Sequence, residues 1–173
     1  MFLGYPGSGK SHFAKQLAEK RHAVRLNGDS MRIALFKTVE AIEAQPDKKV
    51  VNQQTFGAID YAVGQVLRAG HDAVYDANNN RRSIREGLEK LAEEYGAVPI
   101  VVWVKVPFEV ALKRGQTRDV AADSRQWAEE KMRETMERHI ANFDEPIQTE
   151  RVVVIDGTAD FDTQYETFIE QIK

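Results

Sequence analysis

Apolar residues follow two patterns along this chain, and the two patterns alternate. Unbroken apolar runs rich in β-branched residues are typical of strands covered on both faces of a sheet. Segments whose apolar residues recur every three to four positions are typical of helices with one buried face. The alternation predicts an α/β fold with a parallel sheet. We expect its five strands at Met1–Leu3, Ala23–Asn27, Asp72–Asp76, Val98–Val106 and Arg151–Ile155.

The expected helices carry boundary signals of their own. A long helix over about 50–69 ends at Gly70, because glycine readily adopts the conformation that closes a helix. Another helix follows Ser83, which matches a capping box with Glu86. At 173 residues the chain is long enough for one domain with a real core and too short for two ordinary domains.

The segment from Gly4 to Ser11 fits the phosphate-loop pattern G-x-x-x-x-G-K-[ST] at every fixed position. It follows an expected strand and precedes an expected helix, which is the context the motif requires. Successive backbone N–H groups of such a loop, at a helix N-terminus, form a concave anion site. A glycine-rich turn with a chance lysine is the alternative, but the pattern is long and correctly placed.

The loop therefore predicts a nucleoside triphosphate, most simply ATP, with Mg²⁺. Lys10 is expected to reach the β- and γ-phosphates, and the Ser11 hydroxyl is expected to ligate Mg²⁺. Only three residues precede the loop, so either the first strand is short or the true N-terminus lies upstream. The residues assigned to the nucleotide are Gly4, Pro6, Gly7, Ser8, Gly9, Lys10, Ser11 and His12.

Polar residues follow the second expected strand. Ligands of an open parallel sheet bind beyond the carboxyl ends of its strands, which places Asp29 in the same crevice as the phosphate loop. A carboxylate there can accept the proton of an attacking hydroxyl. Arg32, three residues on, shares a helical face with Asp29 and can hold an anionic group of the acceptor. The alternative is that Asp29 or Ser30 merely caps the next helix.

The third expected strand ends at Asp76, a position that suits a carboxylate acting on Mg²⁺ directly or through water. We place Asp76 and Asn78 on the substrate side of the site. A plain turn is the alternative, since Asn and Asp favour turns. A basic cluster follows and is either solvated surface or a contact for a polyanionic acceptor: Arg81, Arg82 and Arg85.

A short polar segment after the fourth strand and its helix predicts a lid at about 114–125. Arg114 and Arg118 are four residues apart and can point together toward the phosphates. A guanidinium group there stabilises negative charge in the transition state. The alternative is a solvated, charged helix end.

The composition excludes several classes of protein. The chain has no cysteine, which excludes disulfides and thiolate metal sites. A net charge of −3 lacks the basic bias of many nucleic-acid binders, although a local basic groove remains compatible with it. No apolar run approaches the ~20 residues that span a membrane, and the first residues do not form a secretory signal, so we expect a cytoplasmic protein. The histidines show no metal-ligand spacing, and we expect structural or surface positions for His12, His22, His71 and His139.

Together these segments resemble the P-loop kinases related to polynucleotide 5′-hydroxyl kinase, from Phe2 to about Ile140. The resemblance implies a single kinase domain over 1–173. It implies a three-layer α/β/α sandwich with a five-stranded parallel sheet and a helical lid. The segments that carry it, besides the phosphate loop, are Asn27–Arg32, Asp76–Asn78 and Val106–Arg118.

The resemblance also implies roles for single residues. Asp29 would be the general base and Arg32 would bind a phosphate of the acceptor. Arg118 would be the transition-state arginine, and Arg114 would lie toward the nucleotide base.

Two positions depart from the family pattern. Gly28 stands where better-known members carry a basic residue, and Ala77 replaces a threonine. Relatives with the same skeleton phosphorylate sugars, antibiotics and nucleotide sugars. The leading interpretation is an ATP-dependent kinase for a hydroxyl acceptor, with the 5′-hydroxyl of a nucleic acid or nucleotide as one candidate. The alternatives are a small-metabolite kinase for a sugar, nucleoside or antibiotic, and a non-kinase ATP-binding switch or accessory protein.

Overall fold

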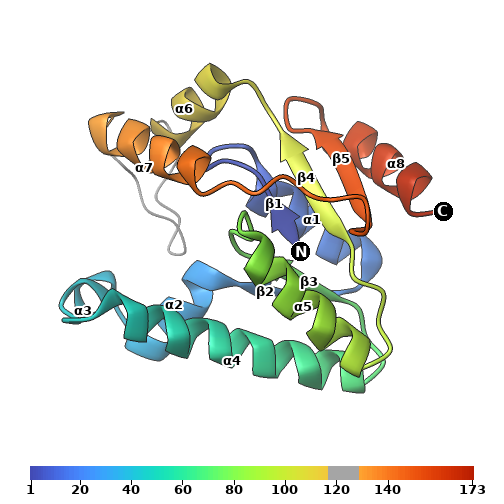
Figure 1. The fold of residues 1–173 in the computed structure, drawn as a ribbon, viewed down its shortest axis with the longest axis horizontal. Coiled ribbons are helices and arrows are strands. Elements are labelled where there is room, and N and C mark those ends of the chain that lie inside the picture. Colours follow the sequence, from blue (N-terminus) through green and yellow to red (C-terminus); the bar gives the residue numbers. More distant parts are fainter. Residues whose placement is uncertain (117–128) are drawn as a thin grey trace.

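The structure is a computed structural model that describes residues 1–116 and 129–173. Strands and helices alternate along these residues (Figure 1). The strands are β1 (Phe2–Leu3), β2 (Val24–Asn27), β3 (Ala73–Asp76), β4 (Val101–Lys105) and β5 (Val152–Asp156). The helices are α1 (Lys10–Arg21), α2 (Gly28–Phe36), α3 (Val39–Glu43), α4 (Lys48–Arg68), α5 (Arg82–Glu94), α6 (Phe108–Gln116), α7 (Glu129–Ala141) and α8 (Phe161–Ile172). The lid was expected at about 114–125. Its residues from 117 onward, Arg118 included, lie outside the described residues.

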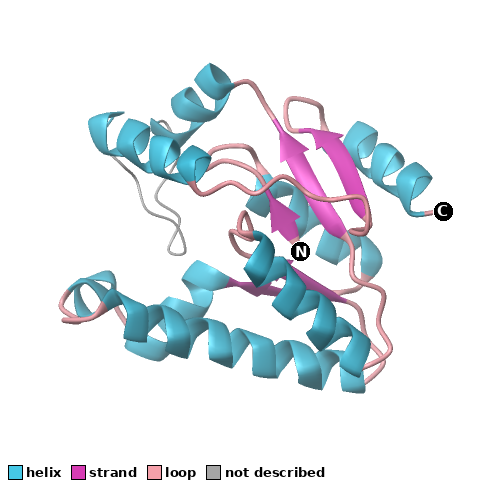
Figure 2. Cartoon of the chain, viewed as in Figure 1, coloured by secondary structure: helices cyan, strands magenta, loops and turns pink. Residues whose placement is uncertain are grey.

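The strands are parallel, as predicted, but they form two hydrogen-bonded groups within the described residues instead of one five-stranded sheet. The groups are β1-β4-β5 and β2-β3 (Figure 2). The division follows from the shortness of β1, which has two residues. The carbonyl of Phe2 accepts from the backbone N–H of Asn79 at 3.2 Å, and Asn79 lies beyond the end of β3. The loop after β3, rather than the strand itself, therefore joins the two groups.

Helices cover the two groups of strands in layers. On one side, Phe13 of α1 and Phe168 of α8 pack against Val102 and Val153 of the strands in one buried cluster. On the other side, α4 and α5 form a second cluster with Tyr75 of β3. Figure 1 shows α8 beside β5, and α4 and α5 beside β2 and β3. None of the helices in the described part of the chain is both long enough and apolar enough to cross a membrane.

The second face of β4 and β5 is more open than the apolar runs predict. Val154 of β5 is 37% exposed, and Trp103 of β4 is half-buried. The apolar face of α7 packs on α6, where Met136 is buried against Ala111. The ring of Phe143 covers Trp103 instead, with 5.6 Å between ring centroids. Coverage on both faces was therefore a wrong prediction for this edge of the sheet.

The start of α5 also differs from its prediction. The helix begins at Arg82, and its N-terminal neighbour Arg81 makes no side-chain cap. The backbone N–H of Arg82 instead donates to the Asp144 carboxylate at 2.9 Å. The Ser83 capping box was therefore wrong, because a residue 62 positions away supplies the cap.

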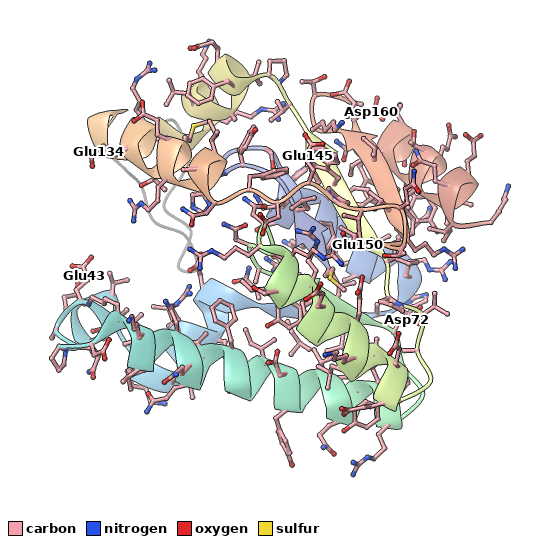
Figure 3. All side chains as sticks on the ribbon, viewed as in Figure 1. Glu43, Asp72, Glu134, Glu145, Glu150 and Asp160 are labelled. Atoms are coloured by element: carbon pink, nitrogen blue, oxygen red, sulfur yellow. The ribbon has the colours of Figure 1, made fainter. Side chains whose placement is uncertain are left out.

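A buried ion pair holds the loop after β3. The Arg85 guanidinium is fully buried and donates to Glu150 at 2.5 and 3.1 Å, and Figure 3 labels Glu150 beside α5. Its third nitrogen donates to the carbonyls of Asn79 and Asn80, each at 3.1 Å. The Asn80 side chain in turn accepts from the backbone N–H of Gly4, the first residue of the phosphate loop. Arg85 is thus neither solvated surface nor a contact for an acceptor. It holds the loop after β3, which in turn contacts the phosphate loop through Asn80.

Candidate active site

A cavity of about 380 Å³ lies where the phosphate loop meets the carboxyl ends of β2 and β3. Most of the predicted site residues within the described chain line it, and two predicted loop residues, Gly4 and Ser8, do not. The predicted residues in its wall are Pro6, Gly7, Gly9, Lys10, Ser11, His12, Asp29, Arg32, Asp76, Asn78 and Arg114. The structure adds Asn27, Gly28, Phe56, Ala77 and His139, which were not assigned to a site.

The phosphate loop is shaped by close packing against α6. Gly7 has a φ of +80°, and a β-carbon there would lie 2.1 Å from the carbonyl oxygen of Ala111. Only glycine fits, because both the conformation and the space exclude a side chain. Gly9 then leads into α1 without a side-chain cap, so the loop reaches a helix N-terminus whose first N–H groups can take an anion.

Lys10 lies over the centre of the loop. Its ammonium group donates to the carbonyls of Gly4 and Tyr5 at 2.8 and 2.7 Å. The positive charge therefore already lies where the loop would receive phosphate groups.

The Asp76 carboxylate is buried and fully engaged. Its Oδ1 atom accepts from the Ser11 hydroxyl at 3.0 Å. Its Oδ2 atom accepts from Arg25 at 2.5 and 2.8 Å and from the Asn27 amide at 2.8 Å. Sequence reasoning missed Arg25. The sequence did contain a clue: Arg25 lies inside the second expected strand, and the third expected strand, which pairs with it, ends in the carboxylate of Asp76.

These contacts bear on how a magnesium ion would be held. Mg²⁺ is usually bound by one or two protein oxygens together with phosphates and waters. The Ser11 hydroxyl suits a direct ligand, and Asp76 suits a group that orients this hydroxyl, because Arg25 and Asn27 occupy its other oxygen. Within the described residues no cluster of three acidic or histidine side chains could hold a metal by itself. The donors therefore fit an ion that arrives with the nucleotide.

Asp29 lies in the first turn of α2 but does not cap this helix. The Asn27 side chain caps it by accepting from the Ser30 N–H at 2.9 Å. Asp29 is 46% exposed and pairs with Arg32 at 2.7 Å. The cap alternative is therefore excluded for both Asp29 and Ser30, and the Asp29 carboxylate faces the cavity with one cationic partner.

Arg32 is held by α4 as well as by Asp29. Its guanidinium donates to Asn52 at 3.2 Å and lies 5.5 Å from the centroid of the Phe56 ring. Such contacts fix the planar group in place. Neither Asn52 nor Phe56 carries a local sequence signal, since both are interior residues of the long helix α4.

The two departures from the family pattern lie side by side. A β-carbon at Gly28 would be 3.7 Å from the Ala77 β-carbon and 3.8 Å from the Phe56 ring. Both small residues therefore leave space next to an aromatic ring, and this part of the cavity wall is partly apolar.

His139 occupies a position that the sequence did not predict. It comes from α7, is half-buried and lines the cavity, and its Nδ1 atom lies 2.5 Å from the Asn78 amide nitrogen. Burial, followed by the positive charges of Lys10 and Arg138, lowers the pKa of His139 to about 4. The ring is therefore neutral at physiological pH, and a histidine that was expected at a structural or surface position lines the cavity.

Arg114 reaches across to the loop after β5. Its guanidinium donates to the Gly157 carbonyl at 2.6 Å. A β-carbon on Gly157 would lie 2.4 Å from the carbonyl oxygen of Ser8, so the loop after β5 packs closely on the phosphate loop. The remaining members of the basic cluster lie outside the cavity wall: Arg81 donates to Asn142, and Arg82 pairs with Glu86.

Known sequences resemble this chain over most of its length. The sequence model of a family described as AAA domain matches residues 1–146. A tRNA dimethylallyltransferase from Bradyrhizobium sp. (strain ORS 278) is 29% identical over 118 residues, which is 66% of this chain. The match covers 34% of that protein, so the chain spans about a third of the length of this curated relative.

Solved structures share the fold. A sugar kinase from Janibacter sp. HTCC2649 superposes with a TM-score of 0.69 at 15% identity, over 99% of this chain and 91% of that one. A gluconokinase from Sinorhizobium meliloti 1021 superposes with a TM-score of 0.62 at 16% identity, over 99% of this chain and 89% of that one. At such identities the likeness establishes the α/β P-loop kinase fold.

Proposed function

This chain belongs to the AAA domain family, and we propose that it is an ATP-dependent kinase that phosphorylates a hydroxyl group of a small metabolite. One cavity is lined both by the phosphate loop and by the Asp29–Arg32 pair, and this observation supports the proposal. The phosphate loop with Lys10 and Ser11 forms one wall, and Asp29 with Arg32 forms another. Phosphoryl transfer needs a cradle for the triphosphate and a carboxylate at the attacking hydroxyl.

Each residue then has a chemical role. Bound ATP supplies the phosphoryl group, and Mg²⁺ neutralises charge on its phosphates. Asp29 accepts the proton of the acceptor hydroxyl while a new oxygen–phosphorus bond forms and the bond to the leaving ADP oxygen breaks. Lys10 stabilises the charge that develops on the phosphates, and Ser11, whose hydroxyl donates to Asp76, would hold Mg²⁺.

Two arginines complete the proposal. Arg114 lies beside the loop after β5, which supports a role toward the nucleotide base. We assign Arg118 to the transition state from the family resemblance, since its position lies outside the described residues.

Several features favour a small acceptor over a nucleic acid. A volume of about 380 Å³ is within the range of small-molecule sites. The guanidinium of Arg32 is already engaged by Asp29, Asn52 and Phe56. The solved proteins of the same fold include a sugar kinase and a gluconokinase. The 5′-hydroxyl of a nucleic acid stays as the competing acceptor, and the test includes it.

The test is single-turnover transfer from γ-labelled ATP to a panel of acceptors. The panel holds D-gluconate, D-glucose, adenosine and a 5′-hydroxyl oligonucleotide. We expect labelled product with one of the three small acceptors, and none with Lys10→Ala. This variant should stay folded because Lys10 is the first residue of α1 and lines the cavity instead of the core. Label on the oligonucleotide alone would favour a polynucleotide kinase. Release of phosphate that no acceptor accelerates would indicate an ATP-binding switch instead.

A further inference from the structure

His139 stands apart from the other cavity residues because of where it comes from. It is the one residue of α7, among those the structure describes, that lines the cavity. Its helix does not need this side chain as an anchor. Arg81 donates to Asn142 at 2.6 Å, and the N–H of Asp144 donates to the Asn80 carbonyl at 2.9 Å, just beyond the end of α7. The contact of His139 with Asn78 therefore calls for another explanation.

The hydrogen bonds around Asn78 determine which ring nitrogen of His139 carries the proton. The backbone N–H of Asn80 can only donate, and it donates to Asn78 Oδ1 at 3.2 Å. The other end of the same amide, Nδ2, therefore faces His139 Nδ1 at 2.5 Å and must be the donor there. A neutral imidazole whose Nδ1 accepts has its proton on Nε2. Asn78 thus makes His139 a hydrogen-bond donor through Nε2.

The surroundings keep this ring neutral. Burial is the main cause of the lowered pKa, and the charges of Lys10 and Arg138 add to it. A proton on Nδ1 would also place two donors face to face across the contact with Asn78. The cavity wall therefore includes an uncharged imidazole ring held by Asn78, together with the ammonium of Lys10 and the guanidinium of Arg32.

We propose that His139 donates a hydrogen bond from Nε2 to an oxygen of the phosphorylation acceptor, and so helps to select an acceptor that carries more than one oxygen. This inference rests on the proposed kinase function. Asn78 directly follows Ala77, and a β-carbon at Gly28 would lie 3.7 Å from the Ala77 β-carbon, so we assign His139 to the acceptor end of the cavity. An uncharged donor suits a hydroxyl or carbonyl oxygen, whereas phosphate oxygens already have the cationic Lys10.

The experiment compares His139→Phe and His139→Gln in the full chain, with His71→Phe at an exposed histidine as the matched control. Phenylalanine keeps a flat ring without either nitrogen. Glutamine can accept from Asn78 and donate into the cavity with one amide. The measurements are the KM values for ATP and for the panel acceptor that the wild type phosphorylates, with thermal melts of each variant.

We expect His139→Phe to raise the acceptor KM about 5–15-fold, the scale of one lost hydrogen bond with an unpaired partner, and to leave the ATP KM within about twofold. Glutamine should restore the acceptor KM to within about threefold of the wild type. The control should change neither KM. An unchanged acceptor KM in folded His139→Phe, or equal rises for both substrates, overturns the proposal.

A second measurement does not depend on how the variants fold. Nitrogen-15 NMR of the wild-type ring should show the proton on Nε2 at pH 7. The Nε2 signal should shift when the same acceptor is added with Mg²⁺ and a non-hydrolysable ATP analogue. A proton on Nδ1, or an Nε2 signal that does not shift when the acceptor is added, overturns the proposal. A wild type that phosphorylates nothing in the panel instead defeats the proposed function, and this inference with it.

Discussion

Replacing Glu150 with glutamine would remove the carboxylate that pairs with Arg85, a fully buried arginine. In the wild type, Arg85 donates two hydrogen bonds to Glu150 and two to the carbonyls of Asn79 and Asn80. Glu150 also accepts from the N–H of Ile147 at 2.9 Å. Glutamine keeps one acceptor oxygen and turns the other into a donor. This donor would face either the guanidinium or the Ile147 N–H.

The magnitude follows from burial, since Arg85 is 0% exposed and the Glu150 side chain is 4% exposed. Breaking such a pair by removing one partner costs about 3–5 kcal/mol, because the remaining charge is left without compensation. In a domain of this size, that corresponds to a fall in Tm of roughly 6–20 °C. The loss should reach the phosphate loop, because the same network holds the Asn80 side chain against Gly4.

Urea unfolding and thermal melts followed by circular dichroism would measure the effect. Glu86→Gln is the matched control, because Glu86 pairs with Arg82 on the same helix while both side chains are about half exposed, at 48% and 44%. The control should change the free energy of unfolding by less than about 1 kcal/mol. If Glu150→Gln also stays within about 1 kcal/mol, the pair does not stabilise the fold and the reasoning is refuted.

The pH dependence gives an independent check. Burial alone would raise the pKa of Glu150, but the hydrogen bonds and charge of Arg85 and the N–H of Ile147 together hold it below its usual 4.5. A carboxylate with a lowered pKa stabilises the fold above pH 4.5, and this contribution is lost as the pH falls through the lowered value. The difference in stability between the wild type and Glu150→Gln should therefore shrink as the solution becomes more acidic.

The remaining predictions concern the active site. Asp29→Asn should lower turnover about 10²-fold or more with little change in ATP affinity. The Tm should also change little, because Asn27 and not Asp29 caps α2, and a loss of stability with normal turnover would contradict the prediction. Arg25→Met should destabilise the fold by about 1.5–3 kcal/mol in urea unfolding, because Asp76 loses charged hydrogen bonds. In the same variant, calorimetry should show tighter binding of free Mg²⁺, and unchanged binding would argue against the ion site beside Asp76. Arg118→Ala should slow the chemical step about 10²–10³-fold in rapid-quench experiments while ATP binding changes little, and equal small effects on both would refute its transition-state role.

Several features of this protein could be read from local sequence. The phosphate loop is a run of neighbouring residues whose backbone builds the anion site, so its pattern is visible without the fold. The parallel α/β architecture follows from alternating apolar periods, and all five strands were found to within a few residues. Asp29 and Asp76 were placed in one crevice because the ends of parallel strands meet at one edge of a sheet, and both line the cavity.

Other features depend on residues that are distant in sequence and meet only in the fold. Arg25 and Asp76 are 51 positions apart, and Asn78 and His139 are 61 positions apart, so no local pattern links either pair. The cap of α5 comes from Asp144, which a local capping rule cannot find. The apolar face of α7 packs on α6, and Val154 of β5 stays 37% exposed; apolar periodicity alone does not say which partner a helix face meets. Local chemistry thus predicted an anion-binding loop and its ligand class, whereas tertiary packing determined which side chains line the cavity beside that loop.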